Sequence, residues 1–190
     1  MKKNIIRLLK VLPLFVLLAV LMSSCTPRLA KPTFRAPNRI AEFDSLIVNL
    51  QANNYDMEEN ISLPDLYWDD IPFLLEIAES DQTLNTFPRN PSSSYAQYQA
   101  YMGIVAMWMI ESIRLDNPYR AALDNQPFPS NNLILVESNS VNSTDFRPNT
   151  FIELRKAADA YKRWWKLYPL IGIDALKKID PLAGTGLKWN

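Results

Sequence analysis

Apolar residues recur at helical spacing along most of the chain. Over residues 39–52 they occupy positions i, i+3, i+7 and i+10, which form one face of an amphipathic helix, and Asn53 follows as a stop signal. Residues 68–70 (Trp-Asp-Asp), with Pro72 behind them, are typical of the start of a second helix, with an Asp as its N-cap. We expect this second helix to bury one apolar stripe and to end near Ser80.

The most apolar stretch beyond the N-terminus falls in a third predicted helix, over residues 94–116. Ser94 and Gln97 have the spacing of a capping box, and residues 100–110 contain no charged side chain. A helix that is apolar on all sides is buried on all sides. Since the uncharged stretch of eleven residues is about 16 Å long, too short to cross a bilayer, we predict the central helix of a bundle, with Gly103 at a close helix crossing.

Residues 124–149 give the weakest helical signal, because they hold three prolines and several Asn and Ser. Their one apolar run, residues 133–136, fits either a short strand or a loop that fills the core. A long helix should then begin at Thr150, which has Glu153 three residues later, and end at Pro169. Its predicted apolar stripe consists of Phe151, Leu154, Ala158, Tyr161, Trp165 and Tyr168.

A short helix over residues 173–179 and a glycine-containing tail complete the chain. These segments predict an all-α fold, in which a single irregular or orthogonal bundle of about five helices occupies residues 39–190.

The first 24 residues have the pattern of a secretory signal peptide. Four basic residues precede an apolar run that is too short to span a membrane, and small residues follow it. The sequence Leu21-Met-Ser-Ser-Cys25 resembles a bacterial lipobox, which implies that Cys25 becomes the first mature residue and carries acyl chains. Several acyl chains together anchor a protein stably. We therefore predict attachment of the mature protein to a membrane through Cys25.

Residues 25–38 form a proline-rich segment without acidic residues, which predicts a flexible tether between the anchor and the domain. Surface-exported lipoproteins of Bacteroidota typically carry an acidic stretch at this place. The basic tether therefore favours the periplasmic side of the outer membrane over the cell surface.

The composition excludes several classes of chemistry. The chain has no His and one Cys, so a Ser-His-Asp or Cys-His relay, the usual zinc sites and an internal disulfide are excluded. Twenty basic residues balance twenty acidic ones, and removal of residues 1–24 leaves a mature net charge of −4. This charge gives no sign of nucleic-acid binding. We expect no metal and no cofactor.

Two groups of residues are candidate binding sites. Trp164 and Trp165, with Tyr168 one turn later, could form an aromatic platform for a sugar or a peptide, or could pack beneath the glycine-containing tail. Trp165 lies on the predicted apolar stripe and Trp164 at its border. Glu111 and Arg114 follow the apolar part of the central helix, where they could line a pocket or form a structural ion pair.

Four segments carry a resemblance to a known family: residues 87–91 (Phe-Pro-Arg-Asn-Pro), 108–114 (Trp-Met-Ile-Glu-Ser-Ile-Arg), 161–165 (Tyr-Lys-Arg-Trp-Trp) and 180–189. Together they are similar to a family of small lipoproteins from Bacteroidota. The resemblance implies an envelope location and a single domain, and it transfers no activity and no catalytic residue.

These observations predict a non-enzymatic, lipid-anchored module of the cell envelope that binds a partner protein or peptide. The contact surface would be the charged face of the helix that starts at Thr150, or residues 124–149. The alternative is a glycan-binding or glycan-processing accessory protein, suggested by eight Tyr and five Trp. A third possibility is an enzyme that uses Glu111 as an acid or base.

Overall fold

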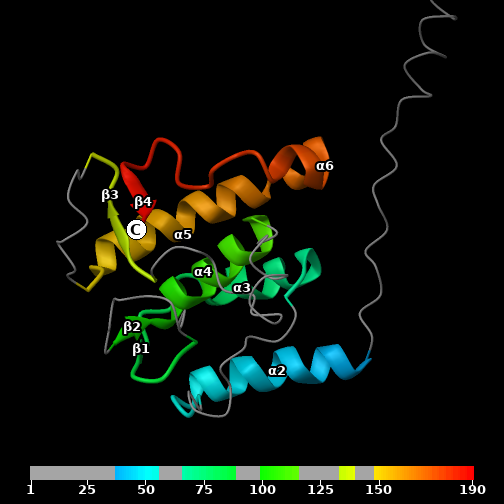
Figure 1. Cartoon of the computed structure of the whole chain (residues 1–190), viewed down its shortest axis with the longest axis vertical. Helices are drawn as coiled ribbons and strands as arrows, with labels where there is room; N and C mark the ends of the chain where they lie inside the picture. Colours follow the sequence, from blue (N-terminus) through cyan, green and yellow to red (C-terminus); the bar gives the residue numbers. More distant parts are fainter. Residues whose placement is uncertain (1–36, 56–65, 89–98, 116–132, 140–147) are drawn as a thin grey trace, which may run out of the picture. The chain divides into compact units, whose positions relative to one another are not determined.

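The structure is a computed structural model, and it describes residues 37–55, 66–88, 99–115, 133–139 and 148–190. Helices dominate these residues, and two short antiparallel sheets accompany them (Figure 1). The elements are α2 (Pro37–Gln51), the 3₁₀ turn η1 (Trp68–Asp70), α3 (Ile71–Ile77), β1 (Thr83–Leu84), β2 (Ala100–Tyr101), α4 (Met102–Leu115), β3 (Leu135–Glu137), α5 (Phe151–Trp165), α6 (Tyr168–Leu176) and β4 (Leu187–Trp189).

The fold is therefore mostly α, and the prediction of a purely all-α fold is wrong because of the two sheets. The predicted signal peptide, Cys25 and most of the predicted tether lie outside the described residues. The last two residues assigned to the tether, Pro37 and Asn38, instead form the first turn of α2, where proline is well tolerated. No helix among the described residues is long and apolar enough to cross a membrane.

Helix α2 buries Phe43, Leu46 and Leu50 and ends as the sequence predicts. Asn53 has a positive φ of 54°, and its N–H donates to the carbonyl of Leu50 at 2.9 Å. The next N–H, of Asn54, reaches back to the carbonyl of Asn49, also at 2.9 Å. This pair of bonds is a Schellman motif, in which Asn takes the left-handed position usually filled by glycine.

The start of α3 differs from the prediction, because the side chain of Asp70 does not cap the N–H groups that follow it in α3. The carboxylate of Asp70 lies inside the first turn and accepts the backbone N–H of Tyr67 at 2.7 Å, so it reaches backwards across η1. The predicted buried stripe is confirmed. It consists of Ile71, Leu74, Leu75 and Ala78.

Helix α4 is the central helix, as predicted, and every residue from Met102 to Ile113 is buried. It begins at Met102 rather than near residue 94, because the two preceding residues form β2 and pair with β1. The first N–H groups of a helix need partners outside it. Here the N–H of Met102 donates to the carbonyl of Gln82 at 2.8 Å, and that of Gly103 to the carbonyl of Ser80 at 3.0 Å.

Gly103 lies at a close crossing, as the sequence predicts. A Cβ at this position would lie 2.7 Å from Leu154 Cδ1 of α5 and would overlap the carbonyl of Ala78 at the end of α3. The absence of a side chain therefore lets α3 and α5 approach the same point of α4.

Helix α5 begins with the predicted capping box. The N–H of Thr150 donates to Glu153 Oε2 at 2.7 Å, and the N–H of Glu153 donates to Thr150 Oγ1 at 3.3 Å. The predicted apolar stripe is rotated, because Phe151 is exposed and Trp165 only half-buried. The buried residues are Leu154, Ala157, Ala158, Ala160, Tyr161 and Trp164.

The prediction that Pro169 ends α5 is wrong, because Pro169 lies in the first turn of α6. The chain turns between Trp165 and Tyr168, and Pro169 fits the start of the new helix because that position needs no intrahelical N–H bond. Gly172 then breaks the helical backbone with φ 73° and ψ 173°. The second part of α6 corresponds to the short helix that was predicted from residue 173.

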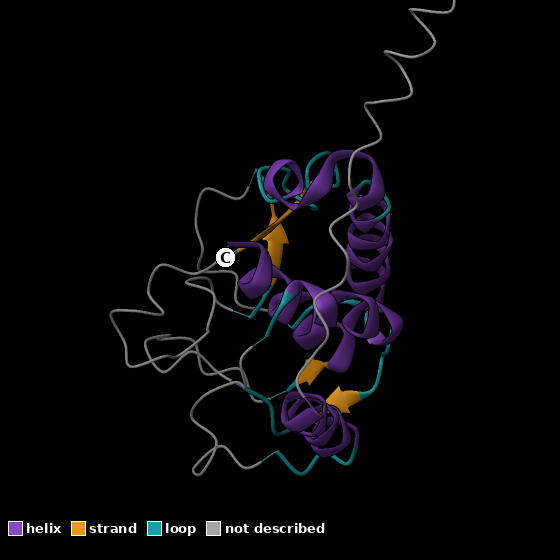
Figure 2. Ribbon diagram, turned by 90° about the vertical axis from the view of Figure 1, so that its right-hand side faces the viewer, coloured by secondary structure: helices purple, strands orange, loops and turns teal. Residues whose placement is uncertain are grey.

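The apolar run 133–136 contributes to a strand, which confirms one of the two alternatives predicted for it. Strand β3 pairs with β4 in the register Leu135↔Trp189, which brings the C-terminal tail onto the core (Figure 2). The side-chain amide of Asn149 accepts from the N–H of Leu135 at 3.1 Å and donates to its carbonyl at 2.7 Å. It therefore provides hydrogen-bond partners for the backbone groups of Leu135, which face away from β4.

Candidate functional site

A buried ion pair lies at the end of α4. Glu111 is 3% exposed, and its carboxylate is held by the guanidinium of Arg114, one turn later. Arg114 Nε donates to Glu111 Oε2 at 3.0 Å, and a second guanidinium nitrogen donates to Oε1. The third nitrogen, Nη1, donates to the carbonyl of Lys177 at 2.9 Å, just past the end of α6. Helices α4 and α6 are thus joined through a single guanidinium.

Tyr161 and Trp189 extend this pair into a network. The hydroxyl of Tyr161 on α5 donates to Glu111 Oε2 at 3.0 Å, and Trp189 Nε1 on β4 donates to the Tyr161 oxygen at 2.8 Å. Four elements that are distant in sequence therefore meet at Glu111. The sequence singled out Glu111 and Arg114 but missed these two partners, because no local pattern connects residues 50 or more positions apart.

The protonation states in the network fit a structural role. Burial and the negative charge of Glu111 raise the pKa of Tyr161 well above its usual value, so the phenol stays protonated and donates. Burial lowers the pKa of Arg114, but the hydrogen bond to Glu111 and the negative charges around it together outweigh burial and raise that pKa, so the guanidinium stays charged. Both carboxylate oxygens of Glu111 already accept hydrogen bonds from protein donors. This arrangement favours an ion pair that holds helices together over an acid or base that meets a substrate.

The aromatic pair on α5 is arranged differently from the sequence prediction. Trp164 is the buried member, at 3% exposure, and its Nε1 donates to the carbonyl of Leu176 at 3.2 Å. Trp165 is half-buried at the edge. The reason is that the buried face of α5 continues from Tyr161 to Trp164, three residues later, so Trp164 and not Trp165 faces the core. A platform for a ligand could therefore use Trp165 and Tyr168, but not the ring of Trp164.

Most of the ring surface in this cluster is engaged by the protein itself. Trp165 stacks with Tyr168 at a centroid distance of 4.8 Å and nearly parallel with Trp68 at 6.2 Å. Lys177 Nζ lies 5.9 Å from the centroid of the Trp68 ring, a cation–π arrangement. The cluster therefore joins η1, α5 and α6.

A small open pocket of about 100 Å³ lies elsewhere, beside the β1–β2 sheet. Its lining contains no charged side chain and none of the predicted site residues. It is formed by Thr83, Gln99, Ala100, Tyr101, Ile104, Pro148 and Asn149. Among the described residues, no group of three His, Cys, Asp or Glu side chains could hold a metal ion.

A second ion-pair cluster joins α5 to the residues just after α3. Glu79 binds the ammonium of Lys162 and lies 3.3 Å from Arg155 Nη1. The hydrogen bond and charge of Lys162 are the main reasons why the pKa of Glu79 is lowered. These contacts occupy two of the cations on the charged face of α5, which the sequence analysis proposed as a contact surface.

We expect Glu79→Gln to lower the free energy of unfolding near neutral pH by less than about 1 kcal/mol, because the three side chains are partly exposed and screened by water. A lowered carboxylate pKa stabilises the fold above the pKa of the unfolded chain, and this stabilisation is lost as the pH falls through the folded value. The difference from the parent chain should therefore shrink on acidification below about pH 4 and in high salt. Urea unfolding at several pH values measures it.

The matched control for this prediction is Glu76→Gln. Glu76 is an exposed carboxylate on α3, three residues before Glu79, and no ion pair involves it within the part of the chain that the structure describes. An equal loss of stability in both variants would show that Lys162 and Arg155 do not act through Glu79.

Taken together, the described residues form a mostly helical, compact unit whose buried ion pair, Glu111 with Arg114, is bound by other protein groups. All of the described residues belong to one compact unit, residues 32–190. The chain belongs to the family described as a domain of unknown function (DUF4943), whose model matches residues 39–190. No curated protein and no solved structure gives a significant match to the chain.

Proposed function

We propose that the protein is a non-enzymatic, lipid-anchored module of the cell envelope that binds a partner protein, and that it is one of the small lipoproteins of Bacteroidota. The signal-like residues 1–24 and the lipobox-like sequence that ends at Cys25 support the anchor. The basic tether supports a position on the periplasmic side of the outer membrane. The internal pairing of Glu111 and Arg114 supports a non-catalytic domain.

The observation that carries the partner-binding proposal is the outer ridge of α5. We define this outer ridge as Ile152, Lys156, Asp159, Arg163 and Lys166, which follow one another at spacings of three or four residues and so share one face of the helix. All five are exposed, and Ile152 is 77% exposed.

The cations of the outer ridge are available for a partner. Lys156, Arg163 and Lys166 form no ion pair within the described residues, in contrast to Arg155 and Lys162, which bind Glu79. The ridge carries a net charge of +2, whereas the mature chain carries −4. Such a local field attracts acidic segments and speeds their association. The proposed partner is therefore a protein with an acidic segment and an apolar side chain that covers Ile152.

The test is capture of envelope proteins by the full, acylated chain and by a charge-reversed variant, Lys156→Glu with Arg163→Glu and Lys166→Glu. We expect the parent chain to retain a reproducible set of acidic proteins, and we expect at least a tenfold loss in the variant, with a far-ultraviolet circular dichroism spectrum like that of the parent. Raised salt should weaken the capture by the parent chain.

Lys178→Glu is the control, because it reverses an exposed charge outside the outer ridge and should leave capture unchanged, whereas Lys156→Glu alone should weaken it. Equal losses from these two single reversals would contradict the proposal. Absence of any reproducible partner, together with binding to a glycan array that Tyr168→Ala abolishes, would instead support the alternative function, a glycan-binding accessory lipoprotein.

A further inference from the structure

Several large apolar side chains are exposed on α6 and on the elements near it. We define this α6 surface as six exposed side chains from η1, α3 and α6 and their flanking turns. Leu170 at 75% and Phe73 at 52% are the most exposed of them. The members are Tyr67, Phe73, Leu167, Leu170, Ile171 and Ile179.

The backbone of α6 presents the centre of this surface to solvent. The N–H groups of Leu170 and Ile171 both donate to the carbonyl of Leu167, at 2.9 and 3.1 Å, and form a single tight turn. The non-helical backbone of Gly172 ends that turn, and a Cβ on Gly172 would have no neighbour within 4 Å. The turn therefore projects two adjacent branched apolar side chains away from the core.

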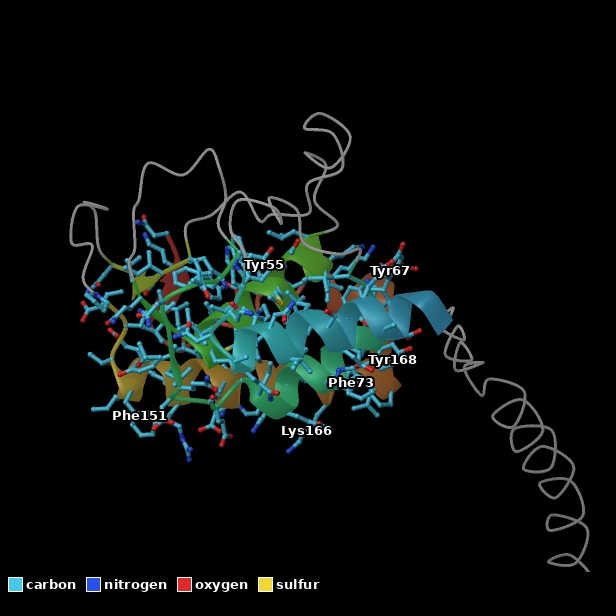
Figure 3. All side chains as sticks on the ribbon, turned by 90° about the horizontal axis from the view of Figure 1, so that it is seen from below. Tyr55, Tyr67, Phe73, Phe151, Lys166 and Tyr168 are labelled. Atoms are coloured by element: carbon cyan, nitrogen blue, oxygen red, sulfur yellow. The ribbon has the colours of Figure 1, made fainter. Side chains whose placement is uncertain are left out.

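The same end of the domain receives the chain from the N-terminus. The rings of Phe73 and of Phe43 on α2 are 6.2 Å apart, which places α2 against the start of α3. Figure 3 shows the labelled Tyr67, Phe73 and Tyr168 at the end where α2 begins, whereas Phe151 lies at the opposite end. In Figure 1 the orange α6 and the blue first turn of α2 lie on the same side of the domain, α6 at its top and α2 at its bottom, with α3 and α4 between them.

The number of residues before α2 limits how far this end can lie from an anchor at Cys25. Twelve residues lead from Cys25 to Pro37. Even fully extended they reach about 40 Å, and a flexible chain of this length averages about 20 Å. An anchored domain therefore presents the α6 surface to lipid at a high effective concentration, so that a weak interaction suffices.

We propose that the α6 surface is a membrane contact, in which Leu170 and Ile171 enter the interfacial region of the bilayer that holds the acyl chains. This inference rests on the lipid anchor in the proposed function. The half-buried rings of Trp165 and Tyr168 lie just behind the turn, and such amphipathic rings favour the level of the headgroups. The outer ridge of α5 then remains accessible for a partner.

Charges around the α6 surface fit a shallow contact. Lys177 and Lys178 flank it, and the acidic groups Asp174 and Asp180 lie on the same segment. Long basic side chains can extend toward headgroups while their stems cover apolar surface. The contact is therefore driven by apolar side chains and needs no strongly anionic lipid.

The experiment places one environment-sensitive fluorophore on the full, acylated chain through Leu170→Cys or, as a matched control, Ile152→Cys. Both positions are apolar and more than 70% exposed; Ile152 lies in the first turn of α5, whereas Leu170 lies past the other end of α5, in α6. Acylation blocks Cys25, so the parent chain measures the background label. Each labelled protein is reconstituted in phosphatidylethanolamine–phosphatidylglycerol vesicles, with and without nitroxide on the lipid acyl chains.

We expect the label at position 170 to shift to the blue and to be quenched severalfold more strongly by the nitroxide lipids than the label at position 152. Equal quenching at both positions, or stronger quenching at 152, in protein that floats with the vesicles would overturn the membrane contact and leave the anchor intact. Failure of the chain to float, together with an unmodified Cys25 by mass spectrometry, would overturn the anchor and the contact with it. Quenching at 170 that requires added envelope proteins would assign the surface to a protein instead.

Discussion

Arg114→Met is expected to lower the free energy of unfolding by about 3–5 kcal/mol, the largest effect of any single substitution considered for this protein. The substitution keeps much of the side-chain volume but leaves the carboxylate of Glu111 buried without its cation. It also removes the donor to the carbonyl of Lys177, so α6 loses a bond to α4. Urea unfolding of the full chain, followed by circular dichroism, measures the change.

The double variant Glu111→Met with Arg114→Met separates the charge from the packing. A buried ion pair that is replaced by apolar side chains of similar volume often leaves stability little changed, so the double variant should recover a large part of the loss. The hydroxyl of Tyr161 would still lack its acceptor, and recovery should therefore be incomplete. If the free energy of unfolding of Arg114→Met lies within about 1 kcal/mol of that of the parent chain, this would contradict a structural role for the pair.

Gly103→Ala is expected to destabilise the protein by about 2–3 kcal/mol, although alanine is the better helix former by about 1 kcal/mol. The new methyl group would overlap the carbonyl of Ala78, which belongs to the backbone and cannot rotate away, and would press on Leu154 Cδ1. The sign of the effect therefore distinguishes helix propensity from the close crossing, and thermal or urea unfolding measures it.

Leu154→Val in the Gly103→Ala background is the informative companion variant. It relieves only the side-chain overlap, so it should return little stability if the contact with the carbonyl of Ala78 dominates. If Gly103→Ala proves more stable than the parent, helices α3, α4 and α5 do not meet as closely as the structure has them.

These two sites explain how the domain can present different surfaces at different ends. The network at Glu111 and the crossing at Gly103 fix α4 between α3 and α5, and they fasten the tail strand β4 and the end of α6 to it. The buried polar groups bind one another and leave the outer ridge of α5 and the α6 surface exposed. A rigid core of this kind suits a binding module, in which the surface carries the function.

Local signals predicted the helix ends that depend on neighbouring residues. The capping box of Thr150 and Glu153, the stop at Asn53 and the burial of α4 all follow from residues within one or two helical turns. Gly103 was identified for a related reason, because a glycine within an otherwise bulky apolar helix indicates a close approach. Each of these features is decided by short-range geometry.

Features that depend on distant residues were predicted incompletely or wrongly. Pro169 is compatible with the end of one helix and with the start of the next, and only the packing of α6 against α5 decides between them. Trp164 and Trp165 are adjacent, so periodicity placed the wrong one in the core by one position. The residues of β3 find their partners 50 or more positions away, in β4, which no local pattern indicates.

By itself, the sequence determined a helical domain with its caps, a candidate lipid attachment at Cys25 and a composition with no His and one Cys. The tertiary structure decided that Glu111 binds Arg114 and Tyr161, that Trp164 is the buried tryptophan, and that Phe73 and Tyr168 share an end with the start of α2. The physical reason is range. Capping and amphipathicity act over one or two turns of helix, whereas burial, ion pairing and exposure depend on which distant segments come together.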